Sequence, residues 1–256
     1  MARKRLSLSK YQAGIKGQDR VILSQAITLV ESNRYSDRQL AGELLESLMP
    51  DTGHSYRIGV TGVPGVGKSS FIDAFGSLLT SLGKKVAVLA IDPSSQVSRG
   101  SILGDKTRME RLSHDPMAYI RPSPTGGSLG GVARKTRETL LLCEAAGFSY
   151  ILVETVGVGQ SETTVRGLVD FFLLLMLPNA GDELQGIKKG IMEMAHGLVI
   201  NKADGDFLPA SRQAKAQYSQ ALRLFPKGEA QWRAKVLTCS ATEGRGLEAV
   251  WQTLEA

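Results

Sequence analysis

The most constraining feature of the chain is a glycine-rich stretch, GVTGVPGVGKSSF, at residues 59–71. Residues 62–69 follow the pattern G-x-x-x-x-G-K-S, between an apolar run that predicts a strand at Tyr56–Thr61 and a helix predicted over 68–82. Glycine permits backbone angles closed to other residues, so such a loop can turn its N–H groups inward around a phosphate. The N-terminus of the following helix adds a favourable dipole. The pattern therefore predicts a phosphate-binding loop, and the alternative is a glycine-rich turn without a ligand.

Two side chains of this loop have expected chemical roles. Lys68 is predicted to reach the β- and γ-oxygens of a nucleotide, and Ser69 to offer its hydroxyl to Mg²⁺. The residues expected to bind the nucleotide phosphates are Gly62, Val63, Pro64, Gly65, Val66, Gly67, Lys68, Ser69 and Ser70.

Beyond this loop, short apolar runs alternate with helical segments. The alternation predicts an α/β P-loop NTPase fold, with a mostly parallel sheet flanked by helices on both faces. Ligands of such sheets bind beyond the carboxyl ends of the strands. The expected strands are Tyr56–Thr61, Lys85–Ile91, Ala118–Arg121, Tyr150–Glu154, Phe171–Leu177, Gly197–Asn201 and Lys235–Cys239. The expected helices are 68–82, 130–146, 184–195, 209–224 and 246–255.

The first 50 residues are predicted to form a helical extension containing two amphipathic helices. One lies in DRVILSQAITLVES, where apolar residues recur at close to helical spacing. The other lies in SDRQLAGELLESLMP, with Ser36 as the expected N-cap and an end before Pro50. The expected domains are therefore residues 1–50, an N-terminal helical extension, and residues 51–256, a P-loop nucleotide-binding domain.

Three acids at or near strand ends are candidate magnesium ligands together with Ser69. Asp92 directly follows VAVLAI, Glu154 ends YILVE, and Asp105 lies in a loop rich in glycine and serine. An acid at the end of a buried strand is costly unless it is paired or bound to a metal, and Mg²⁺ with nucleotide phosphates would neutralise such groups. The alternatives are helix or turn capping for Asp92 and Glu154, and an ordinary surface position for Asp105.

The stretch LVINKADGD indicates which base the nucleotide carries. Asn201, Lys202 and Asp204 form an N-K-x-D sequence just after an apolar strand. The Asp204 carboxylate can accept from both N1–H and the 2-amino group of guanine, whereas adenine lacks this pair of donors. The Lys202 stem can lie along the base, and Asn201 can tie this loop to the phosphate loop.

A third segment agrees with guanine. VLTCSATEGRG places Ser240 and Ala241 after the last predicted strand, where backbone N–H groups can meet the guanine O6, although an ordinary turn is the alternative. Together the three motifs favour GTP and GDP over adenine nucleotides.

Composition excludes several other classes of protein. The net charge is +6, but 6% of residues are aromatic and no basic run is interleaved with aromatics, so we expect no nucleic-acid partner. The longest apolar stretch, Phe171–Leu177, is too short to span a bilayer, so we expect no membrane association. Two isolated cysteines, Cys143 and Cys239, favour a reducing compartment, and no apolar core follows the basic amino end. We therefore expect a cytoplasmic protein, or the mature form of an organellar one.

Several longer blocks are not required by the fold. They are AIDPSSQVSRGSILGDKTRM, IRPSPTGGSLGGVARKT, VETVGVGQSET and NAGDELQGIKKGIMEMA. These blocks, in this order, resemble the MeaB/ArgK family, the GTPases associated with methylmalonyl-CoA mutase, which includes the methylmalonic aciduria type A protein. The resemblance covers nearly the whole chain, including the opening helices.

The resemblance implies a G-protein chaperone of a cobalamin-dependent acyl-CoA mutase. Such a chaperone gates the loading of adenosylcobalamin, protects the mutase and couples both to GTP hydrolysis; a cobalamin adenosyltransferase is a further partner. The resemblance also places Ser69, Asp92, Asp105 and Glu154 around Mg²⁺. It identifies residues 154–162 as a second switch, and residues 178–189 as a further switch that signals to the mutase. For Lys188 and Lys189 in that last segment, the alternative is a solvated helix face.

Members of this family usually continue with a C-terminal helical arm used for dimerisation. The present sequence stops at GLEAVWQTLEA, so we expect the arm to be absent here, with a truncated sequence and a protein that differs from the family as the two alternatives. The resemblance implies a homodimer for the full-length form.

The expected reaction is in-line attack of water on the γ-phosphate of GTP. The phosphate loop, Lys68 and Mg²⁺ stabilise the transferred charge, and Gln160 is the nearest candidate for orienting the water, with a capping role as its alternative. Together, the expected catalytic residues are Lys68, Glu154 and Gln160.

Arg108, Arg121 and Arg134 are possible arginine fingers, with surface or structural roles as the alternative for each, so turnover is expected to be slow without a partner. The rival functions are a nickel-type metallochaperone GTPase, for which paired Cys/His ligands are missing from the sequence, and an amino-acid transport-associated kinase.

Overall fold

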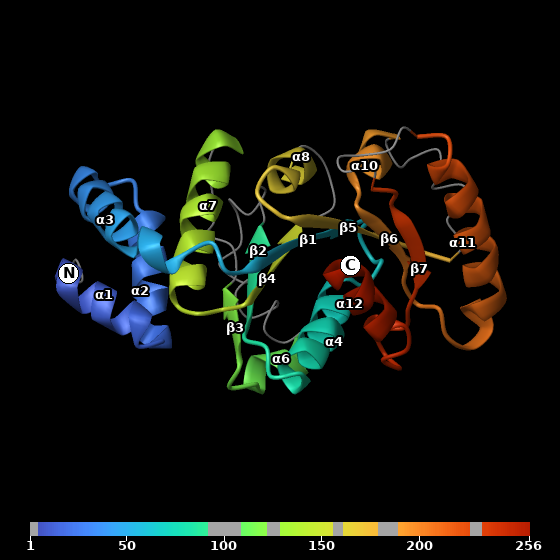
Figure 1. Ribbon diagram of the computed structural model, residues 1–256, viewed down its shortest axis with the longest axis horizontal. Helices are drawn as coiled ribbons and strands as arrows, with labels where there is room; N and C mark the ends of the chain where they lie inside the picture. Colours follow the sequence, from blue (N-terminus) through green and yellow to red (C-terminus); the bar gives the residue numbers. More distant parts are fainter. Residues whose placement is uncertain (1–4, 92–108, 122–128, 156–160, 179–188, 226–231) are drawn as a thin grey trace.

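A single parallel sheet organises the molecule (Figure 1). The computed structural model describes residues 5–91, 109–121, 129–155, 161–178, 189–225 and 232–256. Its strands are ordered β3-β2-β4-β1-β5-β6-β7, and every neighbouring pair is parallel. They are β1 (Tyr56–Gly62), β2 (Val86–Ile91), β3 (Ala118–Arg121), β4 (Tyr150–Thr155), β5 (Phe171–Met176), β6 (Gly197–Ile200) and β7 (Lys235–Thr238).

The seven strands predicted from the apolar runs are all confirmed, with ends that agree to within one residue. Short apolar runs predict strands well here because the strands are covered on both faces; every residue of β5 is buried. The α/β fold class is therefore confirmed. None of the helices that the structure describes is long and apolar enough to cross a membrane.

Helices cover both faces of the sheet (Figure 1). On one face Phe71, Phe75 and Leu112 of α4 and α6, with Val250 of α12, pack against odd-numbered β5 residues such as Leu173. On the other face α7 and α8 pack near Phe172, and α10 and α11 pack near Leu174. The helices of this region are α4 (Lys68–Ser81), α6 (Glu110–His114), α7 (Leu129–Ala145), α8 (Ser161–Arg166), α10 (Lys189–Met194), α11 (Leu208–Leu222) and α12 (Leu247–Glu255).

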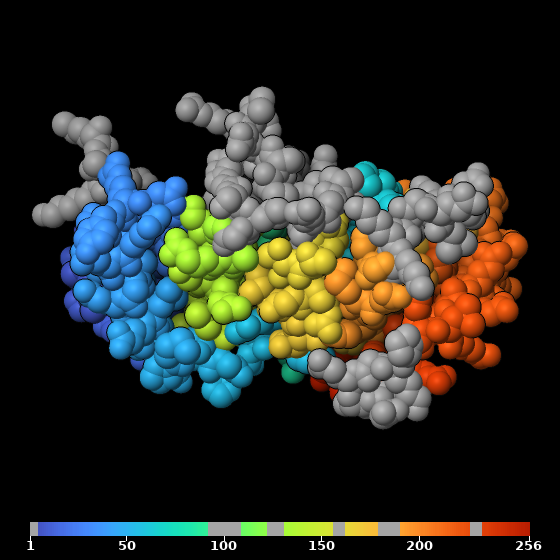
Figure 2. All heavy atoms as spheres, turned by 90° about the horizontal axis from the view of Figure 1, so that it is seen from above, coloured from blue at the N-terminus to red at the C-terminus, as the bar shows by residue number. Residues whose placement is uncertain are grey.

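Three helices, rather than the expected two, open the chain. They are α1 (Leu8–Lys16), α2 (Arg20–Val30) and α3 (Tyr35–Leu48), followed by a 3₁₀ turn at Met49–Asp51. The sequence analysis missed α1 because it buries only Tyr11 and Ile15, too few apolar positions to show a period. These helices pack on α7 and share its core, and Figure 2 shows them at one end of an elongated molecule with α11 at the other. The division of the chain near residue 51 stays a prediction.

The expected N-cap at Ser36 is wrong. Helix α3 begins at Tyr35, after Arg34, so Ser36 lies inside its first turn. The start of the helix is held instead by Asp37, whose carboxylate accepts two hydrogen bonds from Arg5, at 3.1 and 2.7 Å. The hydrogen bond from Arg5 lowers the pKa of Asp37 to about 2. A long-range ion pair therefore ties the first turn of α3 to the segment before α1, and no side chain caps the helix.

The other helix predictions differ mainly at their ends. Of the helix expected over 184–195, residues up to 188 lie outside the described part and the remainder forms α10. Helices α6 and α8 were not predicted, because five or six residues are too few to show a helical period.

Candidate functional site

The predicted phosphate loop lies at the carboxyl end of the central strand. β1 pairs with β4 on one side and with β5 on the other. Strands β2, β3 and β4 all lie on the first side of β1, and strands β5, β6 and β7 all lie on the second. Crevices at such a reversal of strand order are where ligands of open parallel sheets bind. Residues 63–67 connect β1 directly to the N-terminus of α4 at this point.

Two glycines of the loop are required by their surroundings. Gly62 has φ of 149°, and a Cβ there would lie 2.5 Å from the Leu175 carbonyl oxygen of β5. Gly67 has φ of 90°, and a Cβ there would lie 2.8 Å from Nδ2 of Asn201. Both positions combine a backbone conformation that L side chains rarely adopt with a close neighbour, so the pattern of glycines follows from geometry.

Lys68 folds back over the loop that precedes it. Its Nζ donates to the carbonyl oxygens of Gly62 at 2.8 Å and Val63 at 3.2 Å. The side chain is buried, and this burial lowers the pKa of Lys68, while the nearby carboxylates of Glu154 and Glu162 act in the opposite direction. The first turn of α4 therefore carries a dehydrated ammonium group that anionic phosphate oxygens would stabilise.

Ser69 and Glu154 meet beside this lysine. The Ser69 hydroxyl donates to Oε1 of Glu154 at 2.9 Å, because Glu154 lies in β4 opposite Val60 of β1. A hydroxyl and a carboxylate are the hard oxygen donors that Mg²⁺ prefers, so the two residues fit the predicted metal.

The remaining predicted metal and catalytic residues are not part of this geometry. Asp92, Asp105 and Gln160 all lie outside the described residues. Within the described ranges no three His, Cys, Asp or Glu side chains gather as a metal cluster.

The N-K-x-D loop after β6 is tied to the phosphate loop. The buried Asn201 donates from Nδ2 to the Val66 carbonyl oxygen at 2.9 Å, as the sequence suggested. Lys202, at φ of 58°, donates from Nζ to the Gly65 carbonyl oxygen at 2.9 Å. The two loops that would hold opposite ends of a nucleotide are therefore one hydrogen-bonded unit.

Asp204 is oriented by the segment after β7. Its carboxylate accepts from the Ser240 hydroxyl in a very short hydrogen bond and from Oγ1 of Thr242 at 3.2 Å. The Ser240 N–H donates to the Arg245 carbonyl oxygen at 2.9 Å, and the Ala241 N–H donates to Oδ1 of Asn201 at 3.3 Å. Two backbone N–H groups were expected near guanine O6, those of Ser240 and Ala241. The hydrogen bond from the Ala241 N–H is the longer of the two.

Three site residues were missed by the sequence analysis. Cys239 directs its Sγ to Oδ1 of Asn201 at 3.4 Å, Thr242 bonds to Asp204, and Thr155 donates to the Thr61 hydroxyl at 2.8 Å between β4 and β1. Burial raises the pKa of the Cys239 thiol to about 12. The sequence could have indicated these three residues by their position, since each lies at the carboxyl end of a predicted strand or just beyond it.

Known proteins with similar sequences indicate the family of this chain. A model of the family described as methylmalonyl Co-A mutase-associated GTPase MeaB matches residues 23–256. The GTPase ArgK of Escherichia coli is 51% identical over 236 residues, which are 92% of this chain and 71% of that protein. The mitochondrial methylmalonic aciduria type A homolog of Mus musculus is 50% identical over 254 residues, which are 95% of this chain and 61% of that protein.

Solved structures show the same fold. A crystal structure of LAO/AO transport system kinase superposes with a TM-score of 0.83 at 41% identity, covering 100% of this chain and 76% of that one. HypB from Helicobacter pylori, solved in complex with nickel, has a TM-score of 0.56 at 16% identity over 84% of this chain and 91% of that one. The second likeness concerns the fold alone.

Proposed function

Because this chain belongs to the MeaB family of methylmalonyl Co-A mutase-associated GTPases, we propose that it is the nucleotide-driven chaperone of a cobalamin-dependent acyl-CoA mutase. Methylmalonyl-CoA mutase is the partner we favour, with gated loading of adenosylcobalamin and protection of the loaded mutase as its tasks. The observation that carries the proposal is the family match over residues 23–256. A reducing compartment such as the cytoplasm fits the two buried thiols, Cys143 and Cys239.

The proposed guanine nucleotide lies across the carboxyl edge of the sheet. Its phosphates contact the backbone N–H groups of residues 62–70 other than Pro64, which has none, and its base contacts the Asp204 carboxylate and the Ala241 N–H. The hydrogen bonds from Asn201 and Lys202 to the phosphate loop support this placement, because they fix the two halves of the site relative to each other. Preorganisation of this kind lowers the entropy lost on binding.

The γ-phosphate is the reacting group. Its anionic oxygens would compete with the Gly62 and Val63 carbonyls for Lys68, so that the ammonium group turns to the phosphates as charge develops there. When bound by Ser69 and Glu154, with Asp92 and Asp105 as further proposed ligands, Mg²⁺ supplies additional neutralisation of phosphate charge. Gln160 is the residue proposed to orient the attacking water.

Nucleotide state is proposed to reach the mutase through two segments. Residues 154–162 begin at Glu154, one of the magnesium candidates, and residues 178–189 end where α10 begins. We further propose that the full-length protein is a homodimer and that a cobalamin adenosyltransferase is a second partner.

Reconstitution with purified apo-methylmalonyl-CoA mutase and adenosylcobalamin tests the proposal. The rate of holoenzyme formation, followed by cobalamin absorbance, should differ between GTP, a non-hydrolysable GTP analogue and GDP, and the mutase should change the rate of phosphate release. Identical loading and hydrolysis under all conditions would contradict a chaperone role. Labelled γ-phosphate appearing on an amino acid, instead of as free phosphate, would support the kinase alternative.

A further inference from the structure

Two buried hydroxyl groups join the ends of the strands that carry the nucleotide site. Thr61 lies near the end of β1 and Thr155 ends β4, and each residue is 1% exposed. Oγ1 of Thr155 donates to Oγ1 of Thr61 at 2.8 Å, although the two residues are 94 positions apart. A buried hydroxyl is costly unless it is hydrogen-bonded, whereas two valines of the same shape would fill this place without that cost. The pair of threonines therefore calls for a reason other than packing.

The pair lies on the face of the sheet that α7 and α8 cover. Side chains alternate between the two faces of a strand, so Thr155 shares its face with Ile151, which belongs to the same core cluster as Phe172. On β1, Gly59 shares the face of Thr61, and a Cβ at Gly59 would lie 2.8 Å from the Phe172 ring. The hydroxyl bond is therefore set into the apolar core behind the nucleotide site.

The opposite face of the sheet carries the proposed magnesium ligands at the same point. The register of β1 and β4 runs as far as Val60 opposite Glu154, and Thr61 and Thr155 are the next residues on each strand. Glu154 points the other way, towards α4, where its Oε1 accepts from the Ser69 hydroxyl at 2.9 Å. The hydroxyl bond and the contact between Ser69 and Glu154 therefore lie back to back across the sheet.

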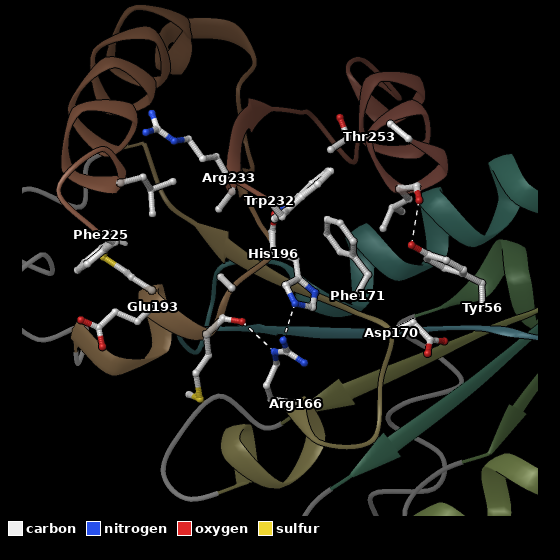
Figure 3. Close-up of a pocket in the computed structure, with 17 residues that line it drawn as sticks. Tyr56, Arg166, Asp170, Phe171, Glu193, His196, Phe225, Trp232, Arg233 and Thr253 are labelled. Atoms are coloured by element: carbon white, nitrogen blue, oxygen red, sulfur yellow. Dashed lines mark hydrogen bonds between the residues drawn. The ribbon is translucent and has the colours of Figure 1, made fainter. Parts of the chain in front are cut away.

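Thr155 is also an anchor for the chain that follows it. Residues 156–160, which include the proposed water-orienting Gln160, connect Thr155 to α8. Helix α8 is fixed at its far end, because Nε of Arg166 donates to the Met194 carbonyl oxygen at 3.1 Å (Figure 3). The hydroxyl bond therefore fixes the point at which this connection leaves the sheet.

We propose that Thr61 and Thr155 are positioning residues for GTP hydrolysis, whose hydroxyl bond holds Glu154 beside Ser69 so that both can bind Mg²⁺ with the nucleotide. Both hydroxyls face the core, so they act through Glu154 and not on the nucleotide itself. Without the bond, the end of β4 gains freedom that must be lost again when the metal binds. The inference rests on the magnesium site of the proposed function, but it does not depend on which mutase is the partner.

Release of mant-GDP, a fluorescent GDP analogue, at increasing Mg²⁺ concentration tests this role. In the parent protein Mg²⁺ should slow the release, because the metal joins the phosphates to Ser69 and Glu154. Thr155→Val keeps the shape of the side chain but removes its hydroxyl, and it should raise the Mg²⁺ concentration for half-maximal slowing about tenfold. GTP hydrolysis at low Mg²⁺ should fall by a similar factor. Release of mant-GDP without Mg²⁺ should be unchanged, which general damage to the fold would not allow.

Two further variants separate the hydroxyl bond from packing. Thr155→Ser loses a methyl group but retains the hydroxyl, so its Mg²⁺ requirement should stay close to that of the parent protein. Thr139→Val removes another buried threonine hydroxyl, which donates within α7 to the Lys135 carbonyl oxygen at 2.8 Å, and should leave the requirement unchanged. If thermal unfolding shows that Thr155→Val does not fold, the double variant Thr61→Val/Thr155→Val takes its place, since it leaves neither hydroxyl of the pair without a partner.

The outcomes distinguish this inference from the magnesium site on which it rests. An unchanged Mg²⁺ requirement in folded Thr155→Val, or one raised equally in Thr155→Ser, would overturn the positioning role, because the hydroxyl would then not matter. Ser69→Ala removes a proposed magnesium ligand directly. A raised requirement in Ser69→Ala with a normal one in Thr155→Val rejects the positioning role alone, and an unchanged requirement in both rejects the magnesium site as well.

Discussion

The two edges of one sheet are built in different ways. At the carboxyl edge, the loops after β1, β6 and β7 are joined by hydrogen bonds from Asn201, Lys202 and Ser240. At the amino edge, rings of Phe171 and Trp232 pack around a cavity with one half-buried cation, Arg166. Directional hydrogen bonds discriminate between similar ligands, whereas apolar walls mainly select for size. The carboxyl edge is therefore built for directional recognition, whereas the wall of the amino-edge cavity is largely apolar.

The sharpest test of this contrast changes the base-binding acid. Asp204→Asn should weaken GTP by about 10⁴-fold, because the amide no longer accepts from both guanine donors, and should favour xanthine nucleotides instead. Nucleotide titrations with GTP and XTP measure the exchange.

A matched control lies two residues further along. Asp206→Asn removes an exposed carboxylate from the same turn and should leave the affinity for GTP unchanged. Unchanged GTP affinity in Asp204→Asn would refute the assignment of the base site.

Removal of the phosphate-loop ammonium is expected to have the next largest effect. Lys68→Ala should slow GTP hydrolysis by at least ~10²-fold, because a buried positive charge no longer stabilises the transferred phosphate. Phosphate release under single-turnover conditions is the measurement, with Lys10→Ala, an exposed lysine on α1, as the control. Hydrolysis at the rate of the parent protein would show that Lys68 serves only to hold the loop conformation through its hydrogen bonds to the Gly62 and Val63 carbonyl oxygens.

Loss of the amide that joins the two carboxyl-edge loops should affect stability and binding together. Asn201→Ala leaves the Val66 carbonyl and the Ala241 N–H without their partner, at a cost of about 2 kcal/mol in the free energy of unfolding. Urea unfolding with and without GDP separates the two effects. A variant as stable as the parent, with normal GDP affinity, would show that the loops do not need this link.

The smallest predicted effect lies at the amino edge. The Tyr56 hydroxyl donates to the Leu254 carbonyl oxygen of α12 at 2.9 Å. Tyr56→Phe should lower the free energy of unfolding by about 1 kcal/mol, and the melting temperature by roughly 3 °C, with GTP affinity unchanged. A change in GTP affinity from this variant would mean that the two edges are less separate than their contacts indicate.

Much of the fold could be predicted from the sequence because its signals are local. Buried apolar runs indicated each strand, and the glycine pattern indicated the turn between β1 and α4. The predictions failed where the signal was short or distant. Helix α1 buries too few apolar residues to show a period, and the start of α3 is held by Arg5, 32 residues from Asp37.

For the candidate site, the residue types, their order and their positions at strand ends could be read from the amino-acid sequence, because a parallel sheet brings all its carboxyl ends to one edge. The hydrogen bonds between these residues could not be read from it and follow from the folded arrangement. Asn201 and Val66 are 135 residues apart, and no local pattern carries the geometry of a hydrogen bond between them. The same holds for the amino-edge cavity, whose walls come from strand starts and helix ends that become neighbours only when the sheet is assembled.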